Sequence, residues 1–173
     1  MVNTDLPIRI QHARNTDVGE YLVLRRAAYV AEAQRLRNPF IAPLQETPEQ
    51  ISSLLTDPHW RLLLAVLTQD NDVGRRGRFV GSIRIQFRDD LADIGRVVVA
   101  PDVRGRGIGS ALLEAAHREA LSHASVQRCE ICVGDAAVTD LALYRRNGYT
   151  HARPRTGEGG RSVPVLTLKL DRR

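Results

Sequence analysis

The segment from Asp102 to Ser110 places glycines at three alternate positions, 105, 107 and 109. Glycine has no Cβ, so successive backbone N–H groups in such a segment can converge on one anion. Apolar residues then recur at helical spacing up to about Ser122, and the N-terminus of a helix adds a partial positive charge. We therefore expect this glycine turn to bind the phosphate groups of a ligand.

The spacing of these glycines separates the known classes of phosphate-binding turn. A dinucleotide-binding turn has the pattern G-x-G-x-x-G, whereas here Gly109 follows Gly107 after a single residue. A Walker loop ends in Gly-Lys-Ser/Thr, and the only lysine of the chain is Lys169. Neither class fits. A tight connection between a strand and a helix, without any ligand, is the remaining structural interpretation.

The pattern Arg/Gln-x-x-Gly-x-Gly/Ala is met by Arg104 to Gly109, and here the chain resembles the GCN5-related N-acetyltransferase (GNAT) family. The strand expected over Ala92 to Pro101 leads into the turn. The segment Leu143 to Tyr149 is similar to the family's late Leu-Tyr-x-x-x-Gly-Phe/Tyr motif. The resemblance covers nearly all of the chain and rests on two motifs, each on the expected element.

The resemblance implies an enzyme that moves the acetyl group of acetyl-CoA to a primary amine of a small molecule. In the family, the main chain of the fourth strand pairs with the pantetheine arm and polarises the thioester carbonyl; Val97 and Val99 match those positions. Tyr144 matches the tyrosine that protonates the departing thiolate, although it could also be a core aromatic residue. The expected cofactor-binding residues are Val97, Val98, Val99, Arg104, Gly105, Arg106, Gly107, Ile108, Gly109, Ser110 and Tyr144.

The acceptor amine must lose a proton before it attacks, so a base is required. Family members often place a glutamate two residues after a strand-entry alanine; this chain has Asp93 directly after Ala92, one methylene shorter. Asp93 could act through a bridging water, or it could simply be solvated near a hairpin turn. Glu32 and Glu46 are the alternative bases, or could hold the substrate ammonium, and with Tyr29 they are the expected substrate residues.

The acceptor is not identified by the sequence. Its pocket is expected to come from the connection 29–50 and the loop 154–163. Carboxylates on that side favour a cationic amine over an acidic one; they are Glu32, Glu46, Glu49 and Asp93. Protein N-termini, lysine side chains, amino acids and amine-bearing antibiotics all stay open as acceptors.

One position departs from the family pattern. An asparagine is frequent seven residues before the late tyrosine, and Ala137 stands there, with Asp140 three residues further on. Contacts to the cofactor from residues 135–140 are therefore in doubt. A non-catalytic domain that senses acyl-CoA is the alternative function.

Composition places the chain among single globular domains over residues 1–173, with 43% hydrophobic and 26% charged residues. The net charge is +5, but the arginines are scattered in pairs along the chain rather than gathered in one tract, which argues against nucleic-acid binding.

The longest apolar run is six residues, Leu62 to Leu67, far below the ~20 of a membrane span. Residues 1–5 lack the basic and apolar regions of a signal peptide, so we expect a cytoplasmic protein.

No metal site is expected. Cys129 and Cys132 have no second pair to complete a zinc site, and in a strand their odd spacing points them to opposite faces. The five histidines lie on separate elements without ligand spacing: His12, His59, His117, His123 and His151. Acetyl-CoA and an amine are thus the expected partners, with a homodimer as one possible assembly.

The elements that must position these residues follow the order βααβββαβαββ. Periodicity predicts helices over 18–34, 47–56, 109–122 and 138–147. It predicts strands over 8–12, 60–68, 79–87, 91–99, 126–133, 149–153 and 163–170, with a glycine-rich loop at 156–160. This pattern predicts an α/β fold of the GNAT type, a mixed and mostly antiparallel sheet of about seven strands with helices on both faces.

Overall fold

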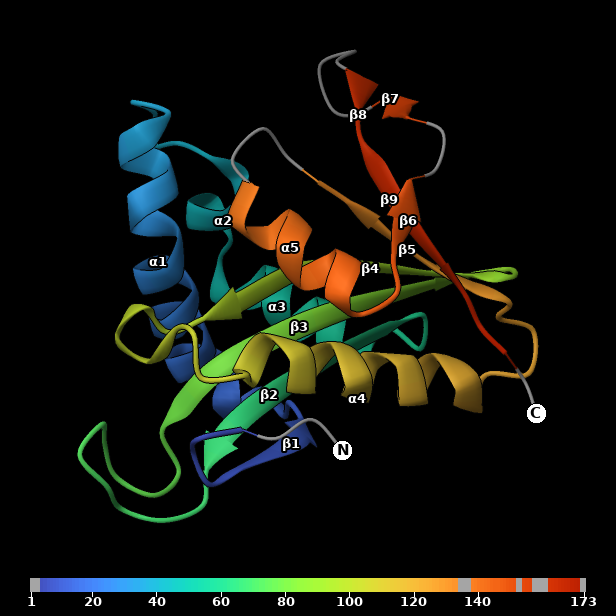
Figure 1. Ribbon diagram of the computed structural model, residues 1–173. Helices are drawn as coiled ribbons and strands as arrows, with labels where there is room; N and C mark the ends of the chain where they lie inside the picture. The colour runs from blue at the N-terminus through green and yellow to red at the C-terminus, as the bar shows by residue number, and fades with distance from the viewer. Residues whose placement is uncertain (1–3, 134–137, 152–153, 157–161, 172–173) are drawn as a thin grey trace.

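The computed structural model describes residues 4–133, 138–151, 154–156 and 162–171. Seven strands form one sheet in the order β1-β2-β3-β4-β5-β9-β6, and β7 pairs with β8 in a separate hairpin (Figure 1). The bounds are β1 Ile8–His12, β2 Trp60–Leu67, β3 Phe79–Arg88, β4 Leu91–Val99, β5 Arg128–Cys132, β6 Thr150–His151, β7 Arg155–Thr156, β8 Ser162–Val163 and β9 Val165–Lys169. Among these described strands only β4 and β5 pair in parallel, which confirms the mixed, mostly antiparallel sheet.

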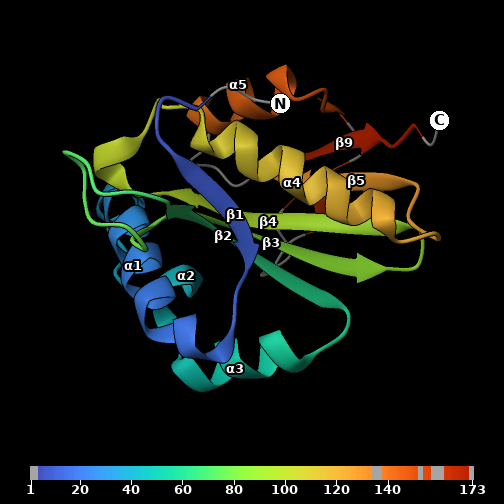
Figure 2. The same cartoon turned by 90° about the horizontal axis from the view of Figure 1, so that it is seen from below.

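Helices cover both faces of this sheet, as the sequence predicts. Their bounds are α1 Val18–Arg35, α2 Ala42–Gln45, α3 Pro48–Thr56, α4 Ile108–Ser122 and α5 Val138–Arg146, with 3-10 turns η1 Asn15–Asp17 and η2 Pro101–Val103. Figure 2 shows α4 and α5 on one side of the sheet and α1, α2 and α3 on the other. The two expected motifs therefore lie on the α4 and α5 side.

The start of α3 follows the capping signal in the sequence. Gln50 N–H donates to Thr47 Oγ1 (3.3 Å), and Thr47 N–H donates to Gln50 Oε1 (2.9 Å), which is a reciprocal capping box. The start of α1 differs, because the Asp17 side chain does not cap it. Its carboxylate accepts the Arg14 N–H instead (2.9 Å) and closes the turn η1 before the helix.

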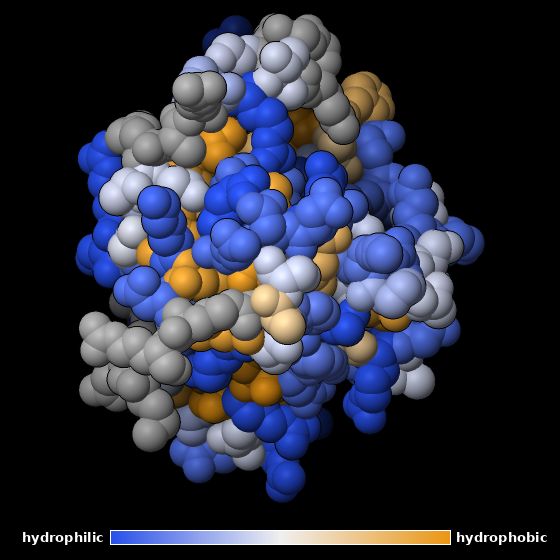
Figure 3. All heavy atoms as spheres, turned by 90° about the vertical axis from the view of Figure 1, so that its right-hand side faces the viewer, coloured by the Kyte–Doolittle hydropathy of each residue, from blue (hydrophilic) through white to orange (hydrophobic). Residues whose placement is uncertain are grey.

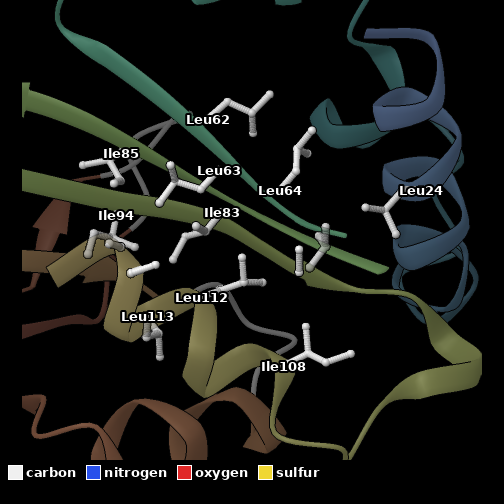
Figure 4. Packing of buried hydrophobic residues seen from close by; sticks show 14 of the residues in the cluster. Leu24, Leu62, Leu63, Leu64, Ile83, Ile85, Ile94, Ile108, Leu112 and Leu113 are labelled. Carbon is white, nitrogen blue, oxygen red and sulfur yellow. The ribbon is translucent and has the colours of Figure 1, made fainter. Parts of the chain in front are cut away.

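The core lies between α4, the sheet and α1. Figure 4 shows Ile108 and Leu112 reaching from α4 toward the sheet, with Leu24 of α1 beyond its opposite face. Each of these side chains is at most 5% exposed, and burying a leucine contributes about 2 kcal/mol. A Cβ at Gly81 of β3 would lie 2.9 Å from Ile108 and 3.0 Å from Leu112. Gly81 thus lets the first turn of α4 approach the sheet closely.

Two features on the α1 side differ from the sequence pattern. Alternation along β3 suggests a polar second face with Ser82 and Arg84, yet these are only 0% and 6% exposed, because α1 covers this face as well. The sequence pattern predicts no helix at α2, since proline is typical of a helix end. Pro43 instead stands in the first turn of α2, where a missing N–H costs no intrahelical hydrogen bond.

The tail also differs in detail. The strand expected over 163–170 is divided into β8 and β9, and 126–133 is shortened to β5. Thr150 and His151 of the expected strand 149–153 form β6, and 152–153 lie outside the described residues. Arg155 and Thr156 form β7 rather than loop, while 157–161 of the expected loop lies outside the described residues. The ends differ because strand boundaries depend on pairing partners that local sequence does not show.

Among the residues described, no helix has the length and apolar character to cross a membrane. Figure 3 views the side of the molecule at the right of Figure 1 and shows a mainly hydrophilic surface broken by small apolar patches. The homodimer considered from the sequence stays a prediction.

Candidate active site

Strand β4 carries one extra residue near its middle. Arg84 pairs with Gly95 and Ser82 pairs with Val98, so two steps along β3 match three along β4. Arg96, within that interval, has φ of 52°, in the left-handed region that non-glycine residues rarely adopt. Such a β-bulge bends its strand. The parallel pairing of β4 with β5 ends at Ile94, directly before the bulge.

Beyond the bulge, β4 pairs with β3 alone among the described strands. The Ala100 N–H donates to the carbonyl of Val80 on β3 (2.9 Å). Because main-chain groups alternate in direction along a strand, those of Val98 also face β3, and those of Val97 and Val99 point the other way, to the side of β5. Within the described residues, the main chain of Val97 and Val99 therefore forms an open strand edge to which an extended ligand could be added.

The glycine turn follows this open edge directly. Gly105 and Gly107 have φ of 80° and 78°, a conformation that glycine adopts without steric cost. Gly107 is the N-cap of α4, so the N–H groups of Ile108, Gly109 and Ser110 have no acceptor within the helix. These N–H groups and the helix dipole make the turn a site for an anion.

Two of the residues expected at the cofactor have structural contacts here. Arg104 Nη2 donates to the Ala28 carbonyl of α1 (3.0 Å), which ties the turn to α1. Ile108 is 1% exposed and lies against Gly81, as described above. Arg106 is half-buried, and its charge helps to lower the pKa of Asp102, after the hydrogen bond from Arg78.

Helix α5, which carries Tyr144, rests on the first turn of α4. Asn147 Nδ2 donates to Ser110 Oγ (3.3 Å), and a Cβ at Gly109 would lie 3.0 Å from Leu143 Cδ2. The two sequence motifs are therefore in direct contact. Tyr144 lies between these two contacts in the sequence and is 6% exposed.

A buried polar group lies behind Tyr144. The Tyr144 and Tyr149 rings are 6.1 Å apart in an edge-to-face arrangement, and the Tyr149 hydroxyl is 2.9 Å from His117 Nε2 of α4. Burial raises the pKa of Tyr149 and lowers the pKa of His117 to about 4. The hydroxyl therefore stays protonated and the imidazole neutral at pH 7, so neither adds charge beside Tyr144.

Asp93 does not stand alone on β4. Arg155 of β7 donates from Nη1 to Asp93 Oδ2 (2.7 Å) and from Nη2 to Glu130 Oε2 (2.5 Å). Asp93 and Glu130 face each other in register across β4 and β5. The hydrogen bond to Asp93 is the main cause that raises the pKa of Arg155. Oδ1 of Asp93 has no hydrogen-bond partner in the described part of the chain, so one oxygen stays able to accept a proton.

Glu46, expected as a base or as a ligand of the substrate ammonium, is bound by two arginines. Arg25 and Arg84 both donate to it, Arg84 through both terminal nitrogens. Burial raises its pKa, but these hydrogen bonds and charges outweigh that effect and hold the pKa below the ordinary value. A carboxylate held by two arginines is a weak base and has little capacity to bind an ammonium group.

The other residues expected on the acceptor side lie along α1 and at the start of α3. Tyr29 is half-buried, and burial raises its pKa against the opposing charges of Arg96 and Arg25. Glu32 is half-buried near Tyr29. Glu49 is exposed at the N-terminus of α3. The charges of Glu32 and Arg96 thus both reach Tyr29, and Glu49 lies on the surface.

The described residues contain no group of three or more His, Cys, Asp or Glu side chains that could hold a metal ion. Cys129 is buried and Cys132 exposed, so the expected opposite orientation is confirmed. Ala137, and the side chains of Asp140 and His151, lie outside the described residues.

Solved structures of acetyltransferases share this fold. PaiA N-acetyltransferase from Thermoplasma acidophilum, in complex with coenzyme A, has a TM-score of 0.73 at 15% identity, over 95% of this chain and 99% of that one. An acetyltransferase from Thermus thermophilus has a TM-score of 0.73 at 18% identity, over 96% and 99%. The ribosomal-protein-S18-alanine N-acetyltransferase from Escherichia coli has a TM-score of 0.69 at 18% identity, over 96% of each chain.

The family described as the acetyltransferase (GNAT) domain matches residues 63–151, more than half of the chain. The protein belongs to the GNAT family. This match confirms the resemblance seen in the glycine turn and in the motif around Tyr144.

Sequence reasoning missed several charged residues around the site. Arg155 and Glu130 were not singled out because their contact with Asp93 depends on how β4, β5 and β7 lie together. Arg25 and Arg84 were missed because a helix position and a strand position, far apart in sequence, converge on Glu46. One sequence signal could have identified Arg25: it falls among the apolar residues of the buried face of α1.

Proposed function

We propose that this protein is an N-acetyltransferase that moves the acetyl group of acetyl-CoA to a primary amine of a small molecule. The observation that carries the proposal is the open main-chain edge at Val97 and Val99, which leads directly into the glycine turn and α4. A strand edge next to a helix N-terminus offers partners for both the amide groups and the phosphates of coenzyme A. The coenzyme A in the structure of PaiA N-acetyltransferase, which shares the fold, supports this assignment.

In this proposal the chain binds acetyl-CoA mainly through its backbone. The N–H groups at Gly107 to Ser110 bind the pyrophosphate, and Gly105 and Gly107 keep side-chain atoms away from it. Val97 and Val99 bind the amides of the pantetheine arm. Arg104 acts indirectly, by fixing the turn to α1.

The chemistry is assigned to three groups. The N–H at Val97 or Val99 donates to the thioester oxygen as the amine attacks the carbonyl carbon; one such donor is worth about 3 kcal/mol in the transition state. Asp93, through Oδ1 and a bridging water, accepts the amine proton. The C–S bond then breaks, and the Tyr144 hydroxyl gives its proton to the departing thiolate.

Direct attack in a ternary complex is favoured over an acetylated cysteine. Burial raises the pKa of Cys129 to about 12 and also raises the pKa of Cys132. Neither thiol is therefore activated at pH 7, because the thiolate is the nucleophilic form.

A thiol-release assay with acetyl-CoA and a panel of amines tests the proposal. An acetyltransferase releases free CoA only when a suitable amine is present, and the amine gains an acetyl group by mass spectrometry. A non-catalytic sensor of acyl-CoA would instead show thermal stabilisation by CoA and no thiol release. Peptides with free N-termini or lysines belong in the panel, and acetylation of peptides alone would contradict a small-molecule acceptor.

A further inference from the structure

Arg25 of α1 is a fully buried cation, with 0% of its surface exposed. Its Nη1 donates to the Tyr21 hydroxyl (3.0 Å) and to Glu46. Its guanidinium carbon lies 6.0 Å from the Tyr21 ring centroid and 5.9 Å from that of Tyr29. The side chain is thus fixed between two aromatic rings on the acceptor side of the sheet, opposite α4.

The charges around Arg25 are not balanced. Among the described residues, Glu46 is the only carboxylate bound to it, and Arg84 shares the same carboxylate. Arg84 Nε also donates to the Tyr21 hydroxyl (3.1 Å). Two guanidinium groups therefore face one carboxylate, and a buried positive charge without a full counter-charge is costly.

Two nitrogens of Arg25, Nε and Nη2, are buried and have no hydrogen-bond partner within the described ranges of the chain. They form one edge of the guanidinium, whose parallel N–H groups match the two oxygens of a carboxylate. The hydroxyl of Ser82 is likewise buried without a partner there, and it lies on the same face of β3 as Arg84. Buried charged donors are normally satisfied, so this edge lacks an acceptor.

The charges of Arg25 and Arg96 both act on Tyr29. Tyr29, one turn after Arg25 on α1, feels the charge of Arg96. Arg96 is the bulge residue of β4, next to the open edge at Val97. In the described part of the chain Arg96 forms no ion pair. A second positive charge therefore acts on Tyr29 and lies next to Val97 in the sequence of β4.

We propose that the acceptor is a small amine carrying a carboxylate, such as an α-amino acid, and that the Nε and Nη2 edge of Arg25 binds this carboxylate. The inference rests on the proposed acetyl transfer and names its substrate class. It replaces the cationic acceptor expected from sequence, because Glu46 is engaged by two arginines and Asp93 by Arg155. Since the edge is buried, neighbouring side chains must move to admit the ligand.

The test compares matched acceptors on the unmodified protein. L-amino acids are each assayed beside their carboxamides and their decarboxylated amines, with thiol release measured at fixed acetyl-CoA. The carboxylate form is expected to have a kcat/KM at least about tenfold higher, because a charged, bidentate contact is lost in the other two. Binding of N-acetyl-amino acids and of their amides to the CoA-loaded protein is measured separately by calorimetry, where the carboxylates are expected to bind more tightly.

The two readouts distinguish failure of the inference from failure of the proposed function. Turnover of amides and decarboxylated amines as fast as carboxylates would overturn the carboxylate site and leave the acetyltransferase standing. Preferential binding of carboxylates without turnover of any amine would overturn the proposed acetyl transfer and leave the carboxylate site standing. The absence of any carboxylate preference in both readouts means that a water molecule, and not a ligand, satisfies Arg25.

Variants locate the site. Arg25→Met is expected to abolish the preference for carboxylates while leaving the Kd for CoA unchanged, and Arg26→Met, at the exposed neighbouring position, is expected to keep both. Because Arg25→Met leaves Glu46 with one partner fewer, the double variant Arg25→Met with Glu46→Gln is made in parallel. A preference that survives in folded protein of either variant overturns the assignment to Arg25.

Discussion

Gly109 of α4 and Leu143 of α5 are in contact so close that a Cβ on Gly109 would lie 3.0 Å from Leu143 Cδ2. The contact joins the glycine turn to the helix of Tyr144. Gly109 is thus needed for the packing of two helices as well as for its free N–H. The position of the proposed acid depends on a residue of the glycine turn.

Gly109→Ala is expected to lower kcat/KM about tenfold with little loss of stability. Alanine favours a helix by up to about 1 kcal/mol over glycine, which offsets the cost of displacing Leu143. The displaced α5 moves Tyr144 away from its place. Thiol release and thermal unfolding measure the two effects.

Gly19→Ala is the matched control for this change, since Gly19 is also in the first turn of a helix and has no atom within 4 Å of a Cβ. It is expected to raise stability and leave kcat/KM unchanged. Equal activity of both variants would show that the contact with Leu143 does not position α5.

Gly105→Ala is expected to weaken CoA binding, measured by calorimetry. Its φ of 80° makes a Cβ cost about 1–2 kcal/mol in stability, and the new methyl group lies at the anion site. Gly77→Ala is the control, because Gly77 has φ of 92° and, like Gly105, open space around a Cβ. Gly77→Ala should lose similar stability and bind CoA normally; a similar loss of affinity in both would contradict the phosphate role.

Tyr144→Phe is expected to lower kcat by about 10²-fold or more, the usual contribution of a general acid, with an unchanged KM for acetyl-CoA. The thiolate then leaves without a proton donor. Tyr149→Phe removes the hydroxyl next to His117 and should reduce stability with little change in kcat. Full turnover of Tyr144→Phe across the pH range would leave Tyr144 as a core aromatic residue only.

Asp93→Asn is expected to lower kcat about 10²-fold, and Glu130→Gln much less. The pair is well matched, since both carboxylates bind Arg155 and face each other across β4 and β5. Loss of the Arg155 ion pair is common to both variants, so only the base role separates them. A larger defect in Glu130→Gln would move the base to β5.

His117 is expected to make stability depend on pH. Its pKa is about 4 in the folded protein and about 6.5 in an unfolded chain. Between these values the unfolded chain binds more protons, so the free energy of unfolding falls as the pH drops from 6.5 to 4, by up to about 3 kcal/mol. In urea titrations, His117→Gln should flatten this part of the profile; an identical slope in both proteins would show that other groups cause it.

The sequence by itself determined most of the elements and the family of the fold. Periodicity and the glycines of the turn act over a few residues, so local reading located β4, α4 and α5. The glycine spacing and the motif at Tyr144 also indicated the GNAT family, which the family match confirms.

Only the tertiary structure decided which arginines bind Asp93 and Glu46. Arg155 meets Asp93 across 62 positions and Arg84 meets Glu46 across 38, and no local pattern encodes such contacts. The bulge at Arg96 likewise depends on the register between β3 and β4. Strand pairing and helix packing therefore determine which carboxylates are neutralised and which arginine lacks a partner among the described residues.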